Sequence, residues 1–491
     1  MTKFAIKFRY LVIVLSVIIG LGGLSMLPRM ETDPDIRNYI PSNMESSINT
    51  DRIEEEFGLQ DMLMIVFRDS CILTPDNLRR IKNTDRQIED LRSVDNTISL
   101  FNTRRIYGEQ GMMIVDPAIS SLPQSSKDIE NLKKQLGDNP LAMGTVISDD
   151  FRMSAIAATI SQDTDENIIM AEIDSVINAN PGSAEVFFGG LPYIRKAIMK
   201  DVRRDGLTLI PIALVIMLAF LWLAFREWKG MVLPFTIVVL AIVFSMGLIP
   251  LLGWKISILS LIVPIMLIAV ANDYGIHMIA KYQELVSENH ADSNDSIVRS
   301  TVRKLRLPVI FTGLTTIAGV LGLLAHAIIP ARQVGVLASA GIAFAVLLTL
   351  FFLPAWLSLL PKSKPLVGGD KISNSLLDRS LTRLAHIVTA RPKRVIVVSA
   401  ILTFIFAVGI LFIKVDGNQE NFFPAKHPVK QASTLINKHF GGSQSISVMI
   451  EGDIKEPSLL KKMDRWTEEI ETLDGVGDSY SIASVLKEMT K

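Results

Sequence analysis

Long apolar segments alternate with polar stretches along the chain, and their lengths predict a protein that crosses a membrane several times. The first apolar run covers residues 10–27 and follows a short basic stretch. Because it is long and ends at Pro28-Arg29 rather than at a small-residue cleavage site, we interpret it as an uncleaved membrane helix instead of a signal peptide. Six further segments can each span about 30 Å of hydrocarbon. They are residues 207–225, 231–252, 256–280, 307–328, 333–360 and 395–413.

Residues 29–205 are polar and charged with short alternating apolar strings, which predicts a folded domain in water. Two strand–helix–strand patterns occur in it, and together they favour a split βαβ, ferredoxin-like sandwich. The first pattern comprises residues 62–67, 76–92 and 97–101. The second comprises residues 144–148, 153–161, 166–178 and 184–190. Asp149-Asp150 lies within the second pattern, and we interpret it as a solvated hairpin turn rather than a metal site.

Composition supports the membrane class. The 491 residues are 49% hydrophobic with a mean hydropathy of +0.35, which is too apolar for an ordinary soluble enzyme. The 50 basic and 50 acidic residues balance, so the net charge does not indicate a nucleic-acid partner. Cys71 is the only cysteine, and the six histidines form no ligand-spaced cluster with it. We expect no structural metal, no cofactor and, since no nucleophile or phosphate-loop pattern occurs, no enzymatic activity.

Basic residues orient the predicted spans. They gather at the N-terminus, in the turn at 225–229, at 299–306 and in 362–394, which the helix order places on one side of the membrane. The positive-inside rule makes that side cytoplasmic and places residues 29–205 outside. Between the fourth and fifth spans lie about 26 polar residues with a basic end. They fit an amphipathic helix on the inner surface or a solvated loop.

The candidate site lies in the fourth apolar segment, where Asp273, Tyr274 and His277 interrupt the hydrocarbon-like sequence. A carboxylate in a membrane span costs about 2.5–3.5 kcal/mol on insertion scales, so it suggests function by default. The four-residue spacing places Asp273 and His277 on one helical face, where a proton could pass between them or to water near Lys281. A structural alternative for Asp273 is satisfaction by hydroxyls across the bundle; the candidates are Thr312, Thr315 and Thr316. Tyr274 also fits an interface anchor, and His277 also fits a water-facing position.

An internal repeat appears when the chain is aligned with itself at an offset of 383 positions. Without a gap, Asp33 aligns with Asp416, Pro41 with Pro424, and Phe57-Gly58 with Phe440-Gly441. The chain therefore begins a second helix-plus-domain unit and covers about a quarter of it. Two-repeat transporters place their coupling site at the repeat interface. We expect either a truncated second repeat or a half-transporter completed by another chain or by a second copy.

Several stretches carry a resemblance to a known family. They are ANDYGIHMIAKYQE at 271–284, FTGLTTIAGVLGLL at 311–324, QVGVLASAGIAFAVLLTLFFLPAWL at 333–357, and GGLPYIRKAI at 189–198. Together with the order of helix, domain and five helices, they resemble the resistance-nodulation-division superfamily, and within it the MMPL-type exporters of lipids and hydrophobic molecules. One departure is Ala269, where the family often has glycine four residues before the aspartate.

The resemblance implies export of lipids or other amphipathic molecules across the cell's inner membrane, driven by the proton gradient. Asp273 would be the protonated group, and Tyr274 would hydrogen-bond a carboxylate of the second repeat. The implied organisation is a first membrane helix (1–28), an extracytoplasmic porter-like domain (29–205), five helices (206–360), a cytoplasmic linker (361–394), a seventh helix (395–413) and a partial second porter-like domain (414–491). Two alternatives share parts of this plan: a Sec-type protein-export subunit and a non-transporting sterol or lipid sensor.

Overall fold

A computed structural model of the 491-residue chain shows two compact units. The structure describes residues 2–33, 35–57, 61–109, 112–139, 141–161, 165–288, 292–363, 376–444, 446–473, 475–477, 479 and 481–489. The membrane unit comprises Met1–Pro41 and Asp201–Val415, and the polar unit comprises Ser42–Lys200 and Asp416–Lys491. The division differs from the predicted domain at 29–205, because residues near Thr32 pack with the membrane unit: the Asp33 amide donates to the Ile256 carbonyl at 2.8 Å.

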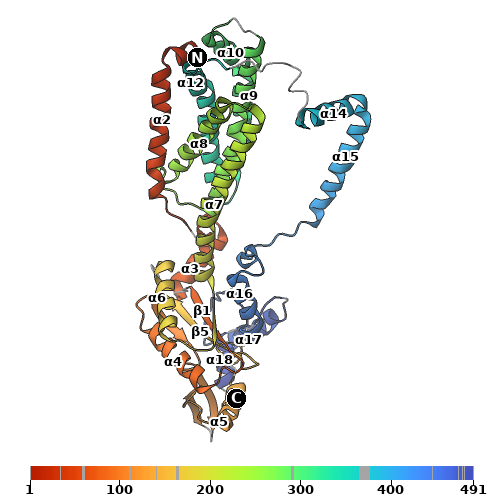
Figure 1. The fold of residues 1–491 in the computed structure, drawn as a ribbon. Helices are drawn as coiled ribbons and strands as arrows, with labels where there is room; N and C mark the ends of the chain where they lie inside the picture. Colours follow the sequence, from red (N-terminus) through yellow and green to blue (C-terminus); the bar gives the residue numbers. More distant parts are fainter. Residues whose placement is uncertain are drawn as a thin grey trace. The chain divides into compact units, whose positions relative to one another are not determined.

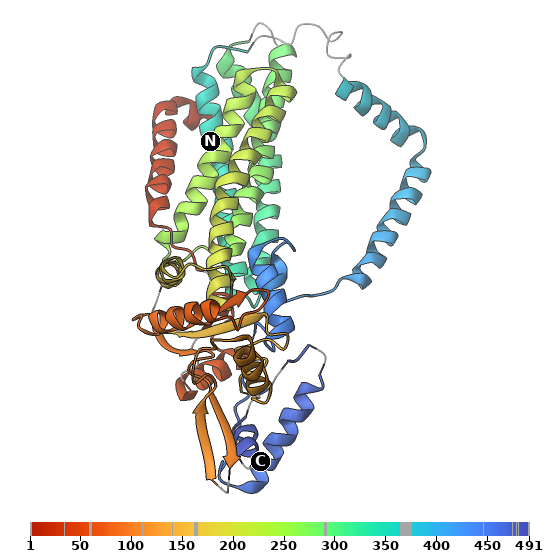
Figure 2. The ribbon, with the colours of Figure 1, turned by 60° about the horizontal axis from the view of Figure 1, so that its bottom comes forward.

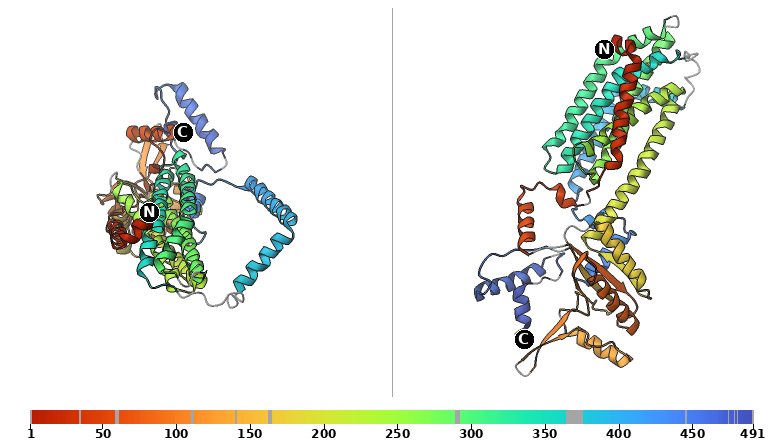
Figure 3. Two further views of the ribbon diagram at one scale, coloured as in Figure 1. Left: turned by 90° about the horizontal axis from the view of Figure 1, so that it is seen from above. Right: turned by 90° about the vertical axis from the view of Figure 1, so that its left-hand side faces the viewer.

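The membrane unit contains seven helices that are long and apolar enough to span a bilayer, as the sequence predicts for the part of the chain described. Several of them run side by side as a bundle in Figures 1 and 2, and Figure 3 shows the same bundle along and across its axis. The elements of this unit are α1 (Thr2–Lys7), α2 (Arg9–Met26), α7 (Leu191–Phe225), α8 (Trp228–Leu251), η3 (Ile258–Leu261), α9 (Ile262–Glu288), α10 (Asn294–Leu321), α11 (Ile329–Leu347), η5 (Leu348–Phe352), α12 (Leu353–Leu359), α14 (Leu376–Ala390) and α15 (Pro392–Gly409).

Burial is uneven among these spans. The span formed by α11, η5 and α12 is the most enclosed. Of the residues in its apolar 18-residue stretch, 72% are buried, whereas 0% are buried in the corresponding stretch of α15. Small residues allow the closest approach between helices, as in other membrane bundles. A Cβ on Gly23 of α2 would lie 2.6 Å from the Val243 carbonyl oxygen of α8, and Gly247 packs against Gly23 in turn. The core of the unit is therefore built around α8, α9 and α11.

The polar stretch between the fourth and fifth spans differs from both predicted forms. Helix α9 continues to Glu288, and α10 already begins at Asn294. The start of α10 is fixed by Ser293, whose side chain accepts a hydrogen bond from the Ser296 amide, which is a normal N-cap. The basic residues of this stretch therefore lie on an extension of the fifth span rather than on a separate surface helix or in a loop.

The polar unit is built on a four-stranded antiparallel sheet in the order β2-β5-β1-β6. Its strands are β1 (Met62–Arg68), β2 (Val94–Ile98), β5 (Met153–Ile160) and β6 (Glu185–Gly189), and its main helices are α4 (Pro75–Glu89) and α6 (Glu166–Ala179). Helix α4 joins β1 to β2, and β5 lies between these two strands, which is the arrangement of a split βαβ unit. Ile65 of β1 stands opposite Ile156 and Phe188 of the neighbouring strands.

The two faces of this sheet are covered by different parts of the chain. Leu63, Ile65 and Phe67 pack with the apolar residues of α4 and α6. Val66 points to the other face, as strand alternation requires, and packs with Ile436 and Phe440 of the C-terminal segment. Both sequence-distant segments therefore contribute to one folded unit.

Some local predictions for the polar unit were wrong. The second strand is Val94–Ile98 rather than 97–101, and residues 144–148 form turns with isolated bridges rather than a strand. Ser154 donates its hydroxyl to the Val146 carbonyl at 3.0 Å, so this segment pairs through side chains as well as backbone. The hairpin of β3 (Arg104–Glu109) and β4 (Met112–Pro117), helix α3 (Glu45–Phe57) and helix α5 (Ser126–Gly137) were not predicted.

The internal repeat is visible in the elements themselves. At the 383-residue offset, the bounds of α2, η1 (Leu27–Arg29) and η2 (Ile36–Tyr39) coincide with those of α15, η6 (Ile410–Phe412) and η7 (Gln419–Phe422). Helix α16 (Pro428–His439) matches α3, and α17 (Pro457–Glu471) matches α4 within one residue; α18 (Ile482–Met489) follows. The same turn recurs too: Asp33 accepts a hydrogen bond from the Asp35 amide at 3.1 Å, and Asp416 accepts one from the Asn418 amide at 2.9 Å.

Candidate functional site

Asp273 and His277 form a pair on one face of α9. The Nε2 atom of His277 lies 3.2 Å from Oδ1 of Asp273, one helical turn away, as the four-residue spacing predicts. Their side chains are 53% and 65% exposed within this chain, respectively, Asp273 being the less exposed. Both groups therefore lie on the surface of the span, where lipid or another helix would contact them. Lys281, the next basic residue along α9, instead pairs with Glu284 at 2.5 Å.

The depth of this pair follows from its neighbours. Gly275, two residues beyond Asp273, packs against Pro234, so close that a Cβ on Gly275 would lie 2.8 Å from the Pro234 Cβ. Pro234 lies six residues beyond the start of α8 at Trp228, or about 9 Å along that helix. Asp273 therefore lies inside the bundle's apolar span and not in a loop, closer to the end where α8 begins.

Tyr274, the residue after Asp273, lies about 100° around the helix from it and is buried in the bundle at 2% exposed. Its hydroxyl has no hydrogen-bond partner among the described residues by geometry, although Thr316 of α10 lies close enough to interact with it. Helix α9 also contacts the π-helical segment η5 of the neighbouring span. Such π segments occur frequently at functional sites. Tyr274 is thus a packed, polar-tipped residue in the bundle interior.

Two of the three threonines considered as alternative partners of Asp273 donate their hydroxyls to other groups. Thr315 donates to the Phe311 carbonyl at 3.0 Å, and Thr316 donates to the Thr312 carbonyl at 2.8 Å. These are bonds to the preceding turn of the same helix, which is a common way for a membrane helix to satisfy a hydroxyl. The structure therefore brings Thr316 toward Tyr274 and shows no hydrogen bond from the described threonines to Asp273.

Two further polar groups in the bundle interior were missed by the sequence reasoning. Oδ1 of Asn272 and Oγ of Ser339 are buried and have no hydrogen-bond partner among the described residues. With the Tyr274 hydroxyl, they place three unpaired polar atoms among α9 and α11, in a setting where buried polar atoms are normally satisfied. The signal for Asn272 was present in the sequence, since it directly precedes Asp273 in the apolar segment.

A second polar cluster ties together several helix ends. Lys229 at the start of α8 is 5% exposed, its Nζ lies 3.5 Å from Oε1 of Glu227, and it contacts the Pro361 carbonyl. Glu227 also accepts hydrogen bonds from Ser363 at 2.8 Å and from Gln283 at 3.1 Å. Sequence reasoning assigned this turn only a topological role. The network satisfies all its charges locally, so it acts as a structural connection between the ends of α8, α9 and α12.

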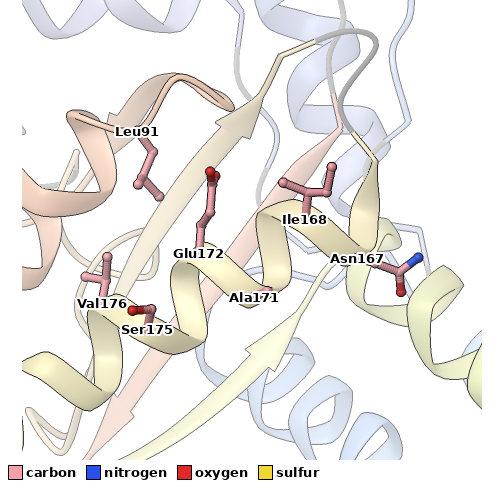
Figure 4. A pocket seen from close by; sticks show the side chains of 7 residues that line it. All are labelled: Leu91, Asn167, Ile168, Ala171, Glu172, Ser175 and Val176. Carbon is pink, nitrogen blue, oxygen red and sulfur yellow. The ribbon is translucent and has the colours of Figure 1, made fainter.

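The described part of the polar unit offers no comparable chemistry. No group of three or more metal-ligating side chains occurs among the described residues. Asp150 accepts hydrogen bonds from the Ser148 hydroxyl at 2.7 Å and the Arg152 amide at 3.1 Å, which is a turn-forming role. A shallow depression of about 610 Å³ lies along α6, and Figure 4 shows the side chains that line it. Its acidic residue, Glu172, accepts a hydrogen bond from Ser93 at 2.5 Å.

Comparison with models of known protein families shows which family the chain belongs to. The model of the MMPL family matches residues 40–395, which include the whole four-stranded sheet of the polar unit and the whole five-helix block with Asp273. The chain belongs to the MMPL family. Membership identifies it as a multi-pass membrane protein and favours a role in transport over an enzymatic one.

Curated membrane proteins are similar to this chain at low identity. The chain is 26% identical over 366 residues to the membrane protein SCO0839 of Streptomyces coelicolor, covering 70% of this chain and 50% of that protein. It is 22% identical over 317 residues to the membrane protein MJ1562 of Methanocaldococcus jannaschii, covering 62% of this chain and 78% of that protein. A second Streptomyces coelicolor membrane protein, SCO6666, is 23% identical over 352 residues, with 68% and 48% covered. The chain thus spans about half the length of the two Streptomyces relatives.

Proposed function

We propose that this MMPL protein exports lipids or other hydrophobic molecules, driven by the proton gradient through protonation of Asp273. The observation that carries the proposal is the Asp273–His277 pair on the surface of a membrane span. An ionised carboxylate at such a position costs about 2.5–3.5 kcal/mol, and a protonated one is much less costly. A group that alternates between these states responds directly to the proton gradient.

His277 extends the path available to the proton. It lies one turn from Asp273 toward the end of α9 that carries Lys281 and Glu284. An imidazole both accepts and donates a proton near neutral pH, so it can exchange protons between the carboxylate and water at the helix end. In this proposal Asp273 is the coupling group and His277 is the shuttle. Thr312, Thr315 and Thr316 support the relay, and Thr316 is the one that lies beside Tyr274.

A covering element for the Asp273 face is part of the proposal. The exposed carboxylate would need a neighbouring surface in the membrane, which a second repeat or a second copy of the chain would provide. Tyr274, whose hydroxyl lacks a partner among the described residues, would hydrogen-bond an acidic group of that surface if α9 turned to bring this buried side chain toward it. In this proposal the protein lies in the inner membrane of the cell. Its N-terminus is in the cytoplasm, and the polar unit is a ferredoxin-like porter domain on the outer side.

The test uses the full chain in cells and the dye Nile red as a hydrophobic probe. We expect efflux of the dye to stop when a protonophore is added, and to fall to the level of cells lacking the protein in Asp273→Asn. Asp273→Glu, which keeps a carboxylate, should retain part of the efflux. Asp76→Asn, at an exposed helix start in the polar unit, is the matched control. Proton-dependent efflux that survives Asp273→Asn would remove the basis of the proposal.

Identification of co-purified molecules provides an independent check. Mass spectrometry of the purified protein should detect bound lipid if the cargo is a lipid. Bound polypeptide in its place would favour a role in protein export. Bound lipid together with efflux that ignores the proton gradient would favour a lipid sensor instead.

A further inference from the structure

Helix α14 differs in composition from the bundle helices, although it directly precedes a membrane span. Among its described side chains, Leu384, Ile387 and Val388 are all exposed. Their spacing of three and four residues places them on one face of the helix. Thr382, His386 and Thr389 fall on the opposite face. The helix is therefore amphipathic, and no described residue covers its apolar face.

The position of α14 relative to α15 suggests what lies against that face. Helix α14 ends at Ala390, Arg391 leaves helical geometry at φ −137° and ψ 57°, and α15 begins at Pro392. Figures 1 and 2 both show the chain turning a sharp corner at this point. Since α15 crosses the bilayer, a helix that bends away from its end runs along the membrane surface.

Charge around the corner is uniformly positive. Arg383, Arg391, Lys393 and Arg394 lie within twelve positions, and no acidic residue occurs from Ser380 to Val415. A basic cluster beside the end of a membrane helix attracts anionic headgroups. Long basic side chains can also keep their charge at the headgroup level while the apolar face inserts below it.

We propose that α14 is an interfacial helix that binds the anionic phospholipid surface, with Leu384, Ile387 and Val388 inserted and Arg383, Arg391, Lys393 and Arg394 contacting headgroup phosphates. The apolar face, the corner at Arg391 and the excess of basic residues over Asp378, the one acidic residue in the sequence of α14, all favour a membrane over an acidic protein partner. The proposal requires only that α15 spans the bilayer, and it is independent of proton coupling at Asp273.

The experiment places an environment-sensitive fluorophore on each face of α14 in the full chain. In a Cys71→Ser background, Leu384→Cys labels the apolar face and His386→Cys labels the polar face; both positions are exposed, so folding should be retained. The labelled proteins are placed in nanodiscs of phosphatidylcholine with and without phosphatidylglycerol. With phosphatidylglycerol, we expect the probe at 384 to shift to the blue, to be quenched by doxyl-labelled lipid and to be several-fold less accessible to acrylamide than the probe at 386.

Neutralising variants test the role of charge. Arg383→Gln/Lys393→Gln/Arg394→Gln should remove the effect of phosphatidylglycerol, at about fivefold in surface partitioning for each side chain. The matched control, Arg299→Gln/Arg303→Gln/Lys304→Gln on α10, should leave it unchanged. Equal acrylamide access at 384 and 386 would overturn the proposal, as would insertion that ignores lipid charge. Protection of 384 from acrylamide without quenching by doxyl lipid would show that protein covers this face, and would also overturn it.

Discussion

Asp85 provides the sharpest test of how the polar unit is assembled. It lies on α4, is 5% exposed, and accepts a hydrogen bond from the Ser99 hydroxyl at 2.5 Å through Oδ2. Its second oxygen, Oδ1, is buried with no hydrogen-bond partner among the described residues. Burial raises the pKa of Asp85 above its usual range, and hydrogen bonds from Ser99 and Thr97 oppose this only in part. The folded unit therefore favours the protonated carboxyl.

The sign of the pH effect follows from this direction. The unfolded chain releases the Asp85 proton at its ordinary pKa, near 3.8, whereas the folded chain retains it to higher pH. Between these two values the folded state binds more protons, so the free energy of unfolding falls as pH rises, and it stays lower above the folded pKa. Asp85→Asn removes the buried charge. We expect it to stabilise the polar unit at neutral pH by about 1 kcal/mol, the lower end of the cost of leaving a buried polar group without a hydrogen-bond partner.

Hydrogen exchange of the full chain, followed by mass spectrometry, would measure the change in local unfolding free energy in α4 and β2. About 1 kcal/mol corresponds to a roughly fivefold change in protection. After correction for intrinsic exchange, protection in the wild type should be lower at neutral pH than near the ordinary Asp pKa of 3.8, and Asp85→Asn should show no such difference. Asp76→Asn, exposed on the same helix, is the control. Lower protection of Asp85→Asn at both pH values would refute the reasoning, because it would show that the ionised carboxylate stabilises the fold.

Two further substitutions test the membrane unit. Gly275→Ala places a Cβ 2.8 Å from Pro234, so α9 must move away from α8 beside Asp273. We expect this to cost about 1–3 kcal/mol of stability and to reduce efflux. Gly319→Ala, with open space around its Cβ, should do neither. Lys229→Met leaves Glu227, which is 24% exposed, without its buried cation, and should lower the stability by up to about 3 kcal/mol in thermal unfolding in detergent. The double variant Lys229→Met/Glu227→Gln should recover part of this loss. Equal stability of the single and double variants would contradict the pairing.

The sequence was sufficient for features that depend on length and periodicity. Hydrocarbon thickness sets the length of a span, so seven apolar segments predicted seven helices. The 383-residue offset predicted a repeated unit, and the coincident bounds of α2 and α15 bear this out at the level of secondary structure. Helical spacing alone placed Asp273 beside His277.

Features that depend on tertiary contacts were not predictable in this way. The polar stretch after Glu288 has weak periodicity, and only the Ser293 cap shows that α10 begins there. The sequence placed Lys229 only in the basic turn at 225–229 and could not show its burial, because its partner Ser363 lies 134 positions away. The unpaired atoms of Asn272 and Ser339 become visible only when the helices are packed together. The β3–β4 hairpin was missed because Gln110-Gly111, between its strands in the sequence, is not the Asn-Gly or Asp-Gly pair that most strongly marks a tight hairpin.

The available energy limits what protonation of Asp273 could do. One proton crossing about 100 mV supplies roughly 2.3 kcal/mol, whereas each acyl CH₂ moved into water costs about 0.8 kcal/mol. Exposing three methylene groups would already exceed that supply, so a proton cannot drive a bare acyl chain through water. In an exporter of this kind, protonation would have to change the balance between two conformations whose free energies differ by a few kcal/mol. The cargo would need to remain in contact with apolar surface at every stage of its path.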